Sequence, residues 1–358
     1  MKKIAENDFA DILIGWYLAN KRDLPWRNTK DPYKIWLSEI ILQQTRVVQG
    51  LPYYEAFVEK FPSIDKLAIA DENEVLRLWQ GLGYYSRARN LHACAKHIHH
   101  ELKNNFPENY QELIKLKGVG PYTAAAIASF AFKEPVAVVD GNVMRVIARF
   151  FGIYDDIAEN STQTTIREIC KRLISTEHPD LFNQAIMEFG ALHCKPNQPL
   201  CGICPFAGGC FAYENLAQKE LPVKQNKVKV KYRYFHYFIW QKGSHFYMNK
   251  RPKGDIWEGL YDLPMIEANN RMDLESLKNY ANNSDLFKNS IIFKSEMPEV
   301  KHVLSHQVIY AKFFLVDIEN EETLLKEPLG DAGFFSTDEI ESLPKPVLIK
   351  NFLNQFLT

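Results

Sequence analysis

The chain has 358 residues, of which 46% are hydrophobic, and its formal net charge is −1. This length suggests two or three domains, the composition excludes a disordered chain, and no run of eighteen apolar residues marks a membrane span. The near-neutral charge by itself gives no hint of nucleic acid. Glu6, Asp8 and Asp11 interrupt the N-terminal stretch where a secretory signal needs apolar residues. We therefore expect a cytoplasmic protein, associated with the nucleoid if it is bacterial, without contact to a membrane.

Residues 1 to about 217 have the pattern of an all-α domain. Helical segments alternate with short stretches of Pro, Gly or Asp. The segments span residues 8–20, 32–48, 71–82, 87–102, 121–132 and 141–151.

A tight turn between two helices is expected within residues 113–132. Gly118 and Gly120 flank one apolar residue, and Pro121 stands in the first turn of the following helix. This pattern is typical of a helix-hairpin-helix, which binds a DNA phosphate without reading base sequence. A Gly-x-Gly turn between helices is also common without any ligand, so the motif alone leaves both interpretations open.

Asp140 follows an apolar run and precedes the helix at 141–151. An aspartate at this place is very often only the N-cap of its helix. The hairpin, the apolar run and the sequence Asp-Gly-Asn, taken together, suggest a functional role as well.

Four of the six cysteines lie within seventeen residues, at gaps of six, two and five: Cys194, Cys201, Cys204 and Cys210. A reducing compartment disfavours a disulfide knot, so the cluster is expected to bind metal. Four thiolates suit zinc and an iron–sulfur cluster equally well.

A basic segment follows the cysteines. Residues 218–233 hold six basic side chains and one acidic one, without helical periodicity, and we assign 218–231 as an interdomain linker. It is either a solvated tether or a segment that runs along a phosphate backbone. Residues 232–358 then change to short aromatic and β-branched runs and end in a helix at about 345–357, which indicates a smaller α+β domain.

Five further motifs are spread over most of the helical domain: DLPWR at 23–27, WLSEIILQQT at 36–45, GLGYYSRARN at 81–90, VDGNVMRV at 139–146 and FNQAIMEFGALHC at 182–194. With the hairpin and the cysteine loop, they make this domain resemble the endonuclease III superfamily of helix-hairpin-helix DNA glycosylases. In that superfamily the same cysteine spacing carries a [4Fe-4S] cluster. The resemblance therefore implies an all-α glycosylase domain in which the four cysteines are cluster ligands.

Tyr122 indicates the branch of the superfamily. Relatives that also cut the DNA backbone carry a lysine at this position, which forms a Schiff base with the sugar, and Tyr122 supplies no amine. The tyrosine resembles the MutY family. That resemblance implies a monomeric DNA N-glycosylase that removes adenine mispaired with 8-oxoguanine or guanine in double-stranded DNA, without strong lyase activity. The alternatives are a pyrimidine-damage glycosylase with lyase activity and a DNA-binding protein without catalysis.

The resemblance also assigns the chemistry, which needs a proton donor for the departing base and a negative charge near the sugar. Glu39, in an apolar helical setting that raises its pKa, would protonate adenine at N7. Asp140 would stay ionised at its helix N-terminus and stabilise or trap the sugar C1′. Tyr122 and Asn142 would position the groups around it.

Further residues match family positions that contact DNA. Gln44 and Tyr84 would insert into the duplex when the base leaves the stack, and Trp26 and Arg27 would line the adenine pocket. The alternatives are core packing for the aromatic residues and a solvent-facing amide for Gln44.

The C-terminal domain resembles the Nudix fold through residues 247–264. The glutamate-rich helix of Nudix hydrolases does not follow Gly259, so this domain is expected to bind and not to hydrolyse. In the family a Phe-Ser-His loop inspects 8-oxoguanine, and this chain has Leu304, Ser305 and His306 instead. The leucine leaves the two polar contacts plausible, and an ordinary hairpin turn is the alternative.

Overall fold

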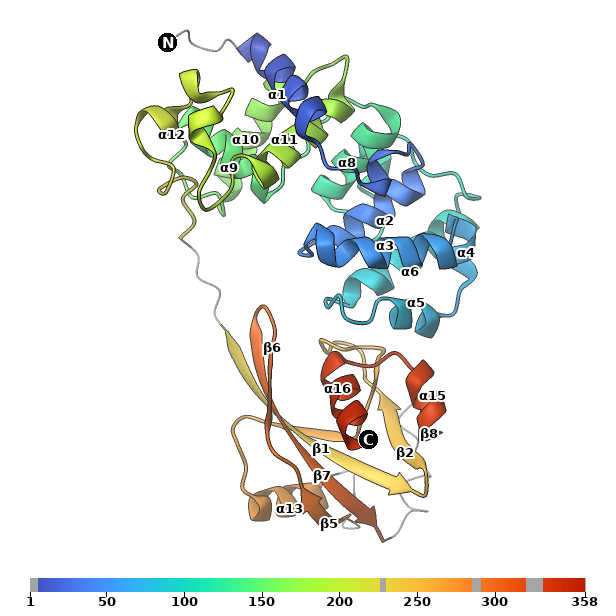
Figure 1. The fold of residues 1–358 in the computed structure, drawn as a ribbon. Coiled ribbons are helices and arrows are strands. Elements are labelled where there is room, and N and C mark those ends of the chain that lie inside the picture. The colour runs from blue at the N-terminus through green and yellow to red at the C-terminus, as the bar shows by residue number, and fades with distance from the viewer. Residues whose placement is uncertain (1–5, 226–229, 285–290, 320–330, 358) are drawn as a thin grey trace. The chain divides into compact units, whose positions relative to one another are not determined.

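The computed structural model describes residues 6–225, 230–284, 291–319 and 331–357, and these form two compact units (Figure 1). The helical unit comprises residues 6–69 and 90–225, and the second unit comprises residues 70–89 and 230–357. Residues 218–225 of the expected linker are thus part of the helical unit, whereas 226–229 lie outside the described residues. None of the described helices is both long enough and apolar enough to span a bilayer.

The helical unit is built from short helices, several of which begin at a proline, as α8 and α11 do, or at a side-chain cap, as α7 and α9 do. Its elements are α1 (Glu6–Asn20), η1 (Pro25–Arg27), α2 (Pro32–Leu42), α3 (Val47–Lys60), α4 (Ile64–Ile69), α7 (Tyr110–Leu113), α8 (Pro121–Phe132), α9 (Gly141–Phe151), α10 (Asn160–Leu173), α11 (Pro179–Leu192), η2 (Cys201–Ile203), η3 (Ala207–Gly209) and α12 (Phe211–Glu214). Helix α6 (Ser86–His100) crosses the division between the units, and α5 (Glu72–Leu78) belongs to the second.

One hydrophobic core of the helical unit lies among α1, α9, α10 and α11, which are packed side by side (Figure 1). Phe9, Leu13, Ile147, Ile166 and Phe182 are almost fully buried in it. Helix α9 ends at Gly152, whose φ of +72° favours glycine. A Cβ there would also lie 2.6 Å from the ring of Phe211, so α12 approaches α9 too closely for any side chain.

The segment between α8 and α9 is extended, and a buried amide fixes it. Asn183 of α11 accepts from the backbone N–H of Val138 at 3.0 Å and donates to the carbonyl oxygen of Val136 at 2.9 Å. The same amide donates to Oγ of Ser129 at 2.8 Å. Because these bonds hold the chain just before Asp140, they set where α9 begins.

The second unit contains a mixed sheet of β1 (Lys231–Lys242), β2 (His245–Lys250), β3 (Tyr261–Asp262), β4 (Met265–Ala268), β5 (Ile291–Glu296), β6 (Val300–Val303), β7 (Gln307–Ile318) and β8 (Ala332–Ser336). Residues 231–240 of β1 pair in parallel with 307–316 of β7 at its centre. The other pairings are antiparallel.

Helices pack on this sheet in the second unit: α13 (Leu274–Asn282), α15 (Thr337–Ser342) and α16 (Val347–Phe356). Leu277 of α13 packs in a core cluster with Phe238 and Phe314 from the sheet. Phe352 of α16 stacks on Phe313 of β7, with 3.6 Å between the ring centroids. The alternation of side chains along a strand explains this, because neighbours such as Phe313 and Phe314 point to opposite faces.

Candidate active site

A cavity of about 600 Å³ lies in the helical unit, lined by side chains from η1, α2, α3, α8, α9 and α11 and from the adjoining loops. Six of the predicted site residues line it: Trp26, Arg27, Glu39, Tyr122, Asp140 and Asn142. Trp26 is 9% exposed, and its ring packs edge-on against that of Tyr54. The cavity therefore combines apolar side chains with ionisable groups, among which Glu39 is buried and Tyr122 and Asp140 are partly exposed.

Glu39, on α2, is 6% exposed. The hydroxyl of Tyr122 donates a hydrogen bond to its Oε2 at 2.7 Å. Burial raises the pKa of Glu39 to about 7; the Tyr122 bond opposes the rise and the nearby Asp140 adds to it. A carboxyl group with this pKa is protonated in much of the population near neutral pH and is able to donate that proton.

Asp140 is the N-cap of α9, and it also lines the cavity, while its functional role stays a prediction. Its Oδ1 accepts from the backbone N–H of Val143 at 2.8 Å, and its Oδ2 accepts from Nδ2 of Asn142 at 2.7 Å. Burial raises the pKa of Asp140, and these two hydrogen bonds oppose that rise. The helix N-terminus was expected to favour the ionised form, and the hydrogen bond from Val143 acts in that direction while burial acts against it.

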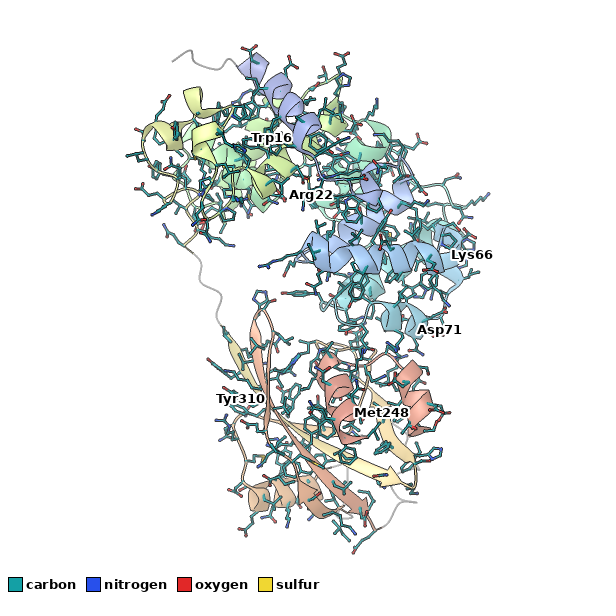
Figure 2. The ribbon with its side chains drawn as sticks, viewed as in Figure 1. Trp16, Arg22, Lys66, Asp71, Met248 and Tyr310 are labelled. Carbon is teal, nitrogen blue, oxygen red and sulfur yellow. The ribbon has the colours of Figure 1, made fainter. Side chains whose placement is uncertain are left out.

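An ion cluster in the cavity wall was missed by the sequence analysis. Glu188 of α11 is 1% exposed and accepts hydrogen bonds from two arginines. Arg22, in the connection between α1 and η1 (Figure 2), donates at 2.8 and 2.6 Å, and Arg27 donates at 2.9 and 2.8 Å. Burial opposes ionisation, but the two guanidinium groups hold the pKa of Glu188 at about 2.

Gln184, one turn before Glu188, was missed too. It lines the cavity, and its Oε1 accepts from the hydroxyl of Tyr17 at 2.6 Å. Both residues lie inside the motif at 182–194, so the motif was the available signal.

The predicted hairpin precedes α8, and its two glycines, Gly118 and Gly120, are exposed while Val119 between them is buried. Gly118 has a φ of +78°, and a Cβ there would lie 2.8 Å from Cβ of Asn90, so the turn requires glycine. A Cβ on Gly120 would meet nothing within 4 Å. The first N–H groups of α8 are therefore approachable, while contact with a phosphate stays a prediction.

Gln44 and Tyr84 do not line the cavity. Gln44 is exposed in the loop after α2 with a φ of +55°, and Tyr84, in the second unit, is 37% exposed with a φ of +48°. Left-handed backbone is costly for side chains other than Gly and Asn, so both residues are held in strained, exposed positions. Their insertion into DNA stays a prediction.

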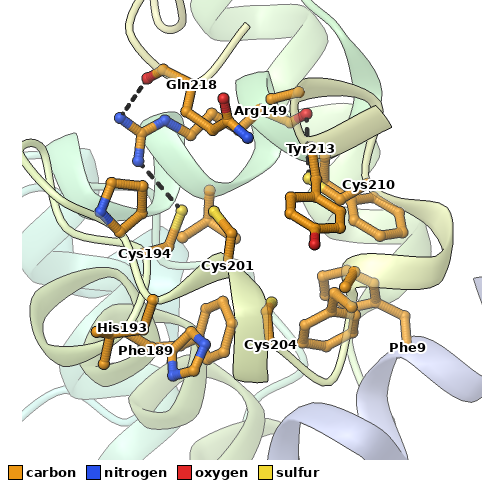
Figure 3. Close-up of a pocket in the computed structure, with 17 residues that line it drawn as sticks. Phe9, Arg149, Phe189, His193, Cys194, Cys201, Cys204, Cys210, Tyr213 and Gln218 are labelled. Atoms are coloured by element: carbon orange, nitrogen blue, oxygen red, sulfur yellow. Dashed lines mark hydrogen bonds between the residues drawn. The ribbon is translucent and has the colours of Figure 1, made fainter. Parts of the chain in front are cut away.

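The four clustered cysteines surround a second, closed-in space (Figure 3). Cys194, Cys201, Cys204 and Cys210 line it together with aromatic side chains from α1, α9 and α11. Within the described ranges, no three His, Cys, Asp or Glu side chains could hold a single metal ion. The four thiols line this one space together.

Two arginines of α9 tie the cysteine loop to the cavity that holds Asp140. Arg145 donates to Oδ1 of Asn142 at 2.9 Å and to the carbonyl oxygen of Cys194 at 2.9 Å. Arg149 donates to Sγ of Cys194 at 3.5 Å (Figure 3). It also donates to the carbonyl oxygen of Lys195 at 2.7 Å. The loop and the N-terminus of α9 therefore form one connected structure.

Comparisons with known proteins agree with this geometry. Residues 37–172 match the family model of the HhH-GPD superfamily base excision DNA repair protein, and residues 236–355 match the NUDIX domain model. The adenine DNA glycosylase of Buchnera aphidicola subsp. Baizongia pistaciae is 36% identical over 305 residues, which cover 84% of either chain. That of Buchnera aphidicola subsp. Acyrthosiphon pisum is 30% identical over 96% of this chain and 97% of its own. The chain belongs to the adenine DNA glycosylase family.

A solved structure supports the fold of the helical part. A thermostable thymine-DNA glycosylase superposes with a TM-score of 0.53 at 29% identity, over 58% of this chain and 95% of its own. Membership in the adenine DNA glycosylase family confirms the predicted branch and the enzyme class, and it is better supported than the endonuclease III alternative. The predicted pair of a helix-hairpin-helix domain and a Nudix-like domain is confirmed as well.

The second unit of this adenine DNA glycosylase family member carries the predicted Leu-Ser-His turn between β6 and β7. Ser305 and His306 are exposed, and the backbone N–H of Leu304 donates to the carbonyl oxygen of Gln307 at 2.8 Å, as in a tight hairpin. In the Nudix-like segment Arg251 donates to Asp262 at 2.9 Å and pairs with Asp255. Arg251 therefore forms ion pairs with two aspartates in this segment.

Proposed function

We propose that the chain hydrolyses the N-glycosidic bond of adenine in double-stranded DNA, where adenine is mispaired with 8-oxoguanine or guanine, and leaves the DNA backbone intact. One observation supports this most. A carboxyl group with a pKa of about 7 and a second carboxyl group, at the N-cap of α9, line the same cavity. A proton donor and a negative charge are the two groups that glycosidic cleavage needs.

Glu39 is the proton donor in this mechanism. An adenine anion is a poor leaving group, so protonation of the ring, at N7 in the family, must accompany cleavage of the bond to C1′. Tyr122 fixes the rotamer of the Glu39 carboxyl through its 2.7 Å hydrogen bond and leaves the other carboxyl oxygen for the base.

Asp140 supplies the negative charge near the sugar. As the C–N bond breaks, positive charge develops at C1′, and a carboxylate held by Val143 and Asn142 stabilises it without having to reorganise. The family role of this residue, stabilising or trapping the sugar, fits that position.

The cavity also suits a flipped purine. Trp26 offers an aromatic surface beside the apolar side chains of Leu42 and Val47, and Gln184 offers a polar edge. Glu188, with both oxygens engaged by Arg22 and Arg27, keeps the wall rigid and ionised.

No lysine is among the described residues that line the cavity. A Schiff base with the sugar needs an amine at the reacting carbon, and Tyr122 stands at the place where lyase relatives carry one. The proposed enzyme is therefore monofunctional, with water as the final acceptor of the sugar.

We assign a [4Fe-4S] cluster to the four cysteines. The four cysteines line one space together with aromatic side chains, and such a set of thiolates suits zinc or an iron–sulfur cluster. The resemblance to the endonuclease III superfamily selects the cluster. A bound cluster would cross-link the loop from Cys194 to Cys210. Arg149, which donates to Sγ of Cys194 and to the carbonyl oxygen of Gln218, would then hold that loop against α9.

Ser305 and His306 are proposed to distinguish 8-oxoguanine from guanine. Both are exposed at the tip of the β6–β7 hairpin, where their side chains are able to donate to or accept from a base. Leu304 would give apolar contact in place of the aromatic ring of the family loop.

The experiment that tests this function uses a duplex with one adenine opposite 8-oxoguanine. We expect release of free adenine, with strand breakage only after alkali. Strand breakage before alkali would indicate a lyase, and release of a damaged pyrimidine from a matched duplex would support the endonuclease III alternative.

A further inference from the structure

A second groove, of about 490 Å³, adjoins the active-site cavity of the helical unit. Asp140 and Asn142 line both of them, so the groove begins where the cavity places the reacting sugar. Lys219 and Lys224 also line the groove, together with Pro196 of the cysteine loop.

The lining of the groove is strongly basic. Arg145, Arg149, Lys219 and Lys224 contribute to it, and among the described lining residues Asp140 is the single acid. The two arginines already donate to backbone carbonyls and to Asn142. Lys219 and Lys224 are exposed, so their ammonium groups are available to a ligand.

The backbone that carries these lysines is fixed to the helical unit. Arg149 donates to the carbonyl oxygens of Gln218 at 2.7 Å and Leu221 at 2.9 Å. The backbone N–H of Ile157 donates to the carbonyl oxygen of Val223 at 3.0 Å, and that of Gln225 donates to Asp156 at 3.2 Å. Residues 218–225 are therefore an anchored edge of the groove and not a solvated tether.

A DNA strand whose sugar lies at Asp140 must place its neighbouring phosphates within a few ångströms of that point, since one strand carries a charge about every 3.4 Å. Because the cavity binds the base, the sugar-phosphate backbone of the DNA strand has to run past Asp140 and Asn142. A basic groove that opens at these two residues is suited to receive it.

We infer that Lys219 and Lys224 bind backbone phosphates of the strand that carries the adenine. The inference rests on the proposed function, because that function brings the sugar to Asp140. It assigns sequence-independent affinity to these lysines and no part in bond cleavage, since point charges on phosphates position a strand without reading its bases.

The test compares three full-length double variants with the native protein. Lys219→Ala/Lys224→Ala removes both charges, Lys219→Arg/Lys224→Arg keeps them, and Lys103→Ala/Lys171→Ala removes two exposed lysines that line neither the cavity nor the groove. Binding is measured from about 50 to 200 mM salt, with a duplex that carries 2′-fluoroadenosine opposite 8-oxoguanine, because fluorine at C2′ slows loss of the base.

The slope of log K against log salt should be less steep by about 1 to 2 units in Lys219→Ala/Lys224→Ala, because each lost phosphate contact contributes about 0.9 to that slope. Its affinity at low salt should fall about ten-fold, while the arginine variant stays within about two-fold of the native protein. If the native protein releases adenine but the salt slope of Lys219→Ala/Lys224→Ala equals that of Lys103→Ala/Lys171→Ala, the assignment of the groove is wrong and the proposed function stands. Absence of adenine release by native protein would overturn the proposed function.

Discussion

The hydroxyl of Tyr122 donates a 2.7 Å hydrogen bond to Oε2 of Glu39, a carboxyl group that is 6% exposed and has a pKa of about 7. Donation to the carboxylate stabilises its ionised form, so the tyrosine lowers a pKa that burial raises. The pair therefore sets the pH at which the proposed proton donor loses its proton.

Replacing this tyrosine should move the alkaline side of the pH profile. In Tyr122→Phe the pKa of Glu39 rises because the opposing hydrogen bond is lost. A general acid acts in its protonated form, so adenine release, which falls as pH rises through about 7 in the native protein, should fall at higher pH in the variant.

Tyr33→Phe is the matched control, since the Tyr33 hydroxyl donates to the carbonyl oxygen of Phe61 and does not contact Glu39. Removing that buried hydrogen bond should cost about 1 kcal/mol of stability and leave the profile in place. Single-turnover rates between pH 5 and 9 give both profiles. A profile for Tyr122→Phe that coincides with that of the control would show that Tyr122 does not tune Glu39.

Glu188→Gln should destabilise the helical unit. The change leaves Arg22 and Arg27 beside a neutral amide. We expect the free energy of unfolding to fall by roughly 2 to 4 kcal/mol, which is less than for a fully buried ion pair because the side chain of Arg22 is 36% exposed. Denaturant unfolding measures this cost. Glu112→Gln, which breaks an exposed pair with Lys115, should change stability by less than about 0.5 kcal/mol.

The contribution of Glu188 also depends on pH in a defined direction. Its pKa falls from 4.5 to about 2 on folding, so its stabilising effect is full above about pH 4.5 and is lost as pH falls towards 2. The difference between native protein and Glu188→Gln should shrink over that interval. A difference that stays constant down to pH 2.5 would disagree with the ion cluster described here.

Purified protein should contain about four irons and four labile sulfides per chain, and Cys201→Ser should lower both. Cys170→Ala, which removes a buried thiol of the α10 core, should retain them. Elemental analysis after anaerobic purification decides the point. Stoichiometric zinc without iron would reject the assigned cluster.

Discrimination between 8-oxoguanine and guanine should depend on the β6–β7 turn. Two neutral hydrogen bonds contribute about 0.5 to 1.5 kcal/mol each, so Ser305→Ala/His306→Ala should reduce the preference for 8-oxoguanine roughly five- to a hundred-fold. Activity on guanine mispairs should change little.

Ser244→Ala/His245→Ala changes the same two residue types at the exposed turn between β1 and β2 and should keep the native ratio. Equal ratios for both double variants would assign partner recognition elsewhere in the chain.

Much of the site was predictable because its residues lie in short motifs next to helix ends. Prolines and caps start α8 and α9 where the sequence indicated, at Pro121 and Gly141, and this places Tyr122 and Asp140. Glu188 and Arg22 are 166 residues apart, and Gln184 and Tyr17 are 167 apart. Residues so far apart in the sequence produce no local pattern, so their contacts are found only once α1 and the residues after it pack against α11.

The sequence did not predict how segments far apart in the chain pair with each other, for the same reason. Short aromatic and β-branched runs were expected in residues 232–358, but the parallel pairing of β1 with β7 depends on the chain between them. Likewise, the basic segment after Cys210 showed its charge in the sequence, whereas its attachment to Arg149 and Ile157 required the folded helical unit.

The most direct measurement is adenine release from an 8-oxoguanine:adenine duplex by the native protein and by Asp140→Asn, with duplex binding measured on the same preparations. We predict that the native protein releases adenine without a strand break before alkali. Asp140→Asn should retain binding and lose at least about a hundred-fold in single-turnover rate, because the carboxylate that stabilises positive charge at C1′ is gone. Near-native turnover by Asp140→Asn, or strand cleavage by the native protein, would contradict the account.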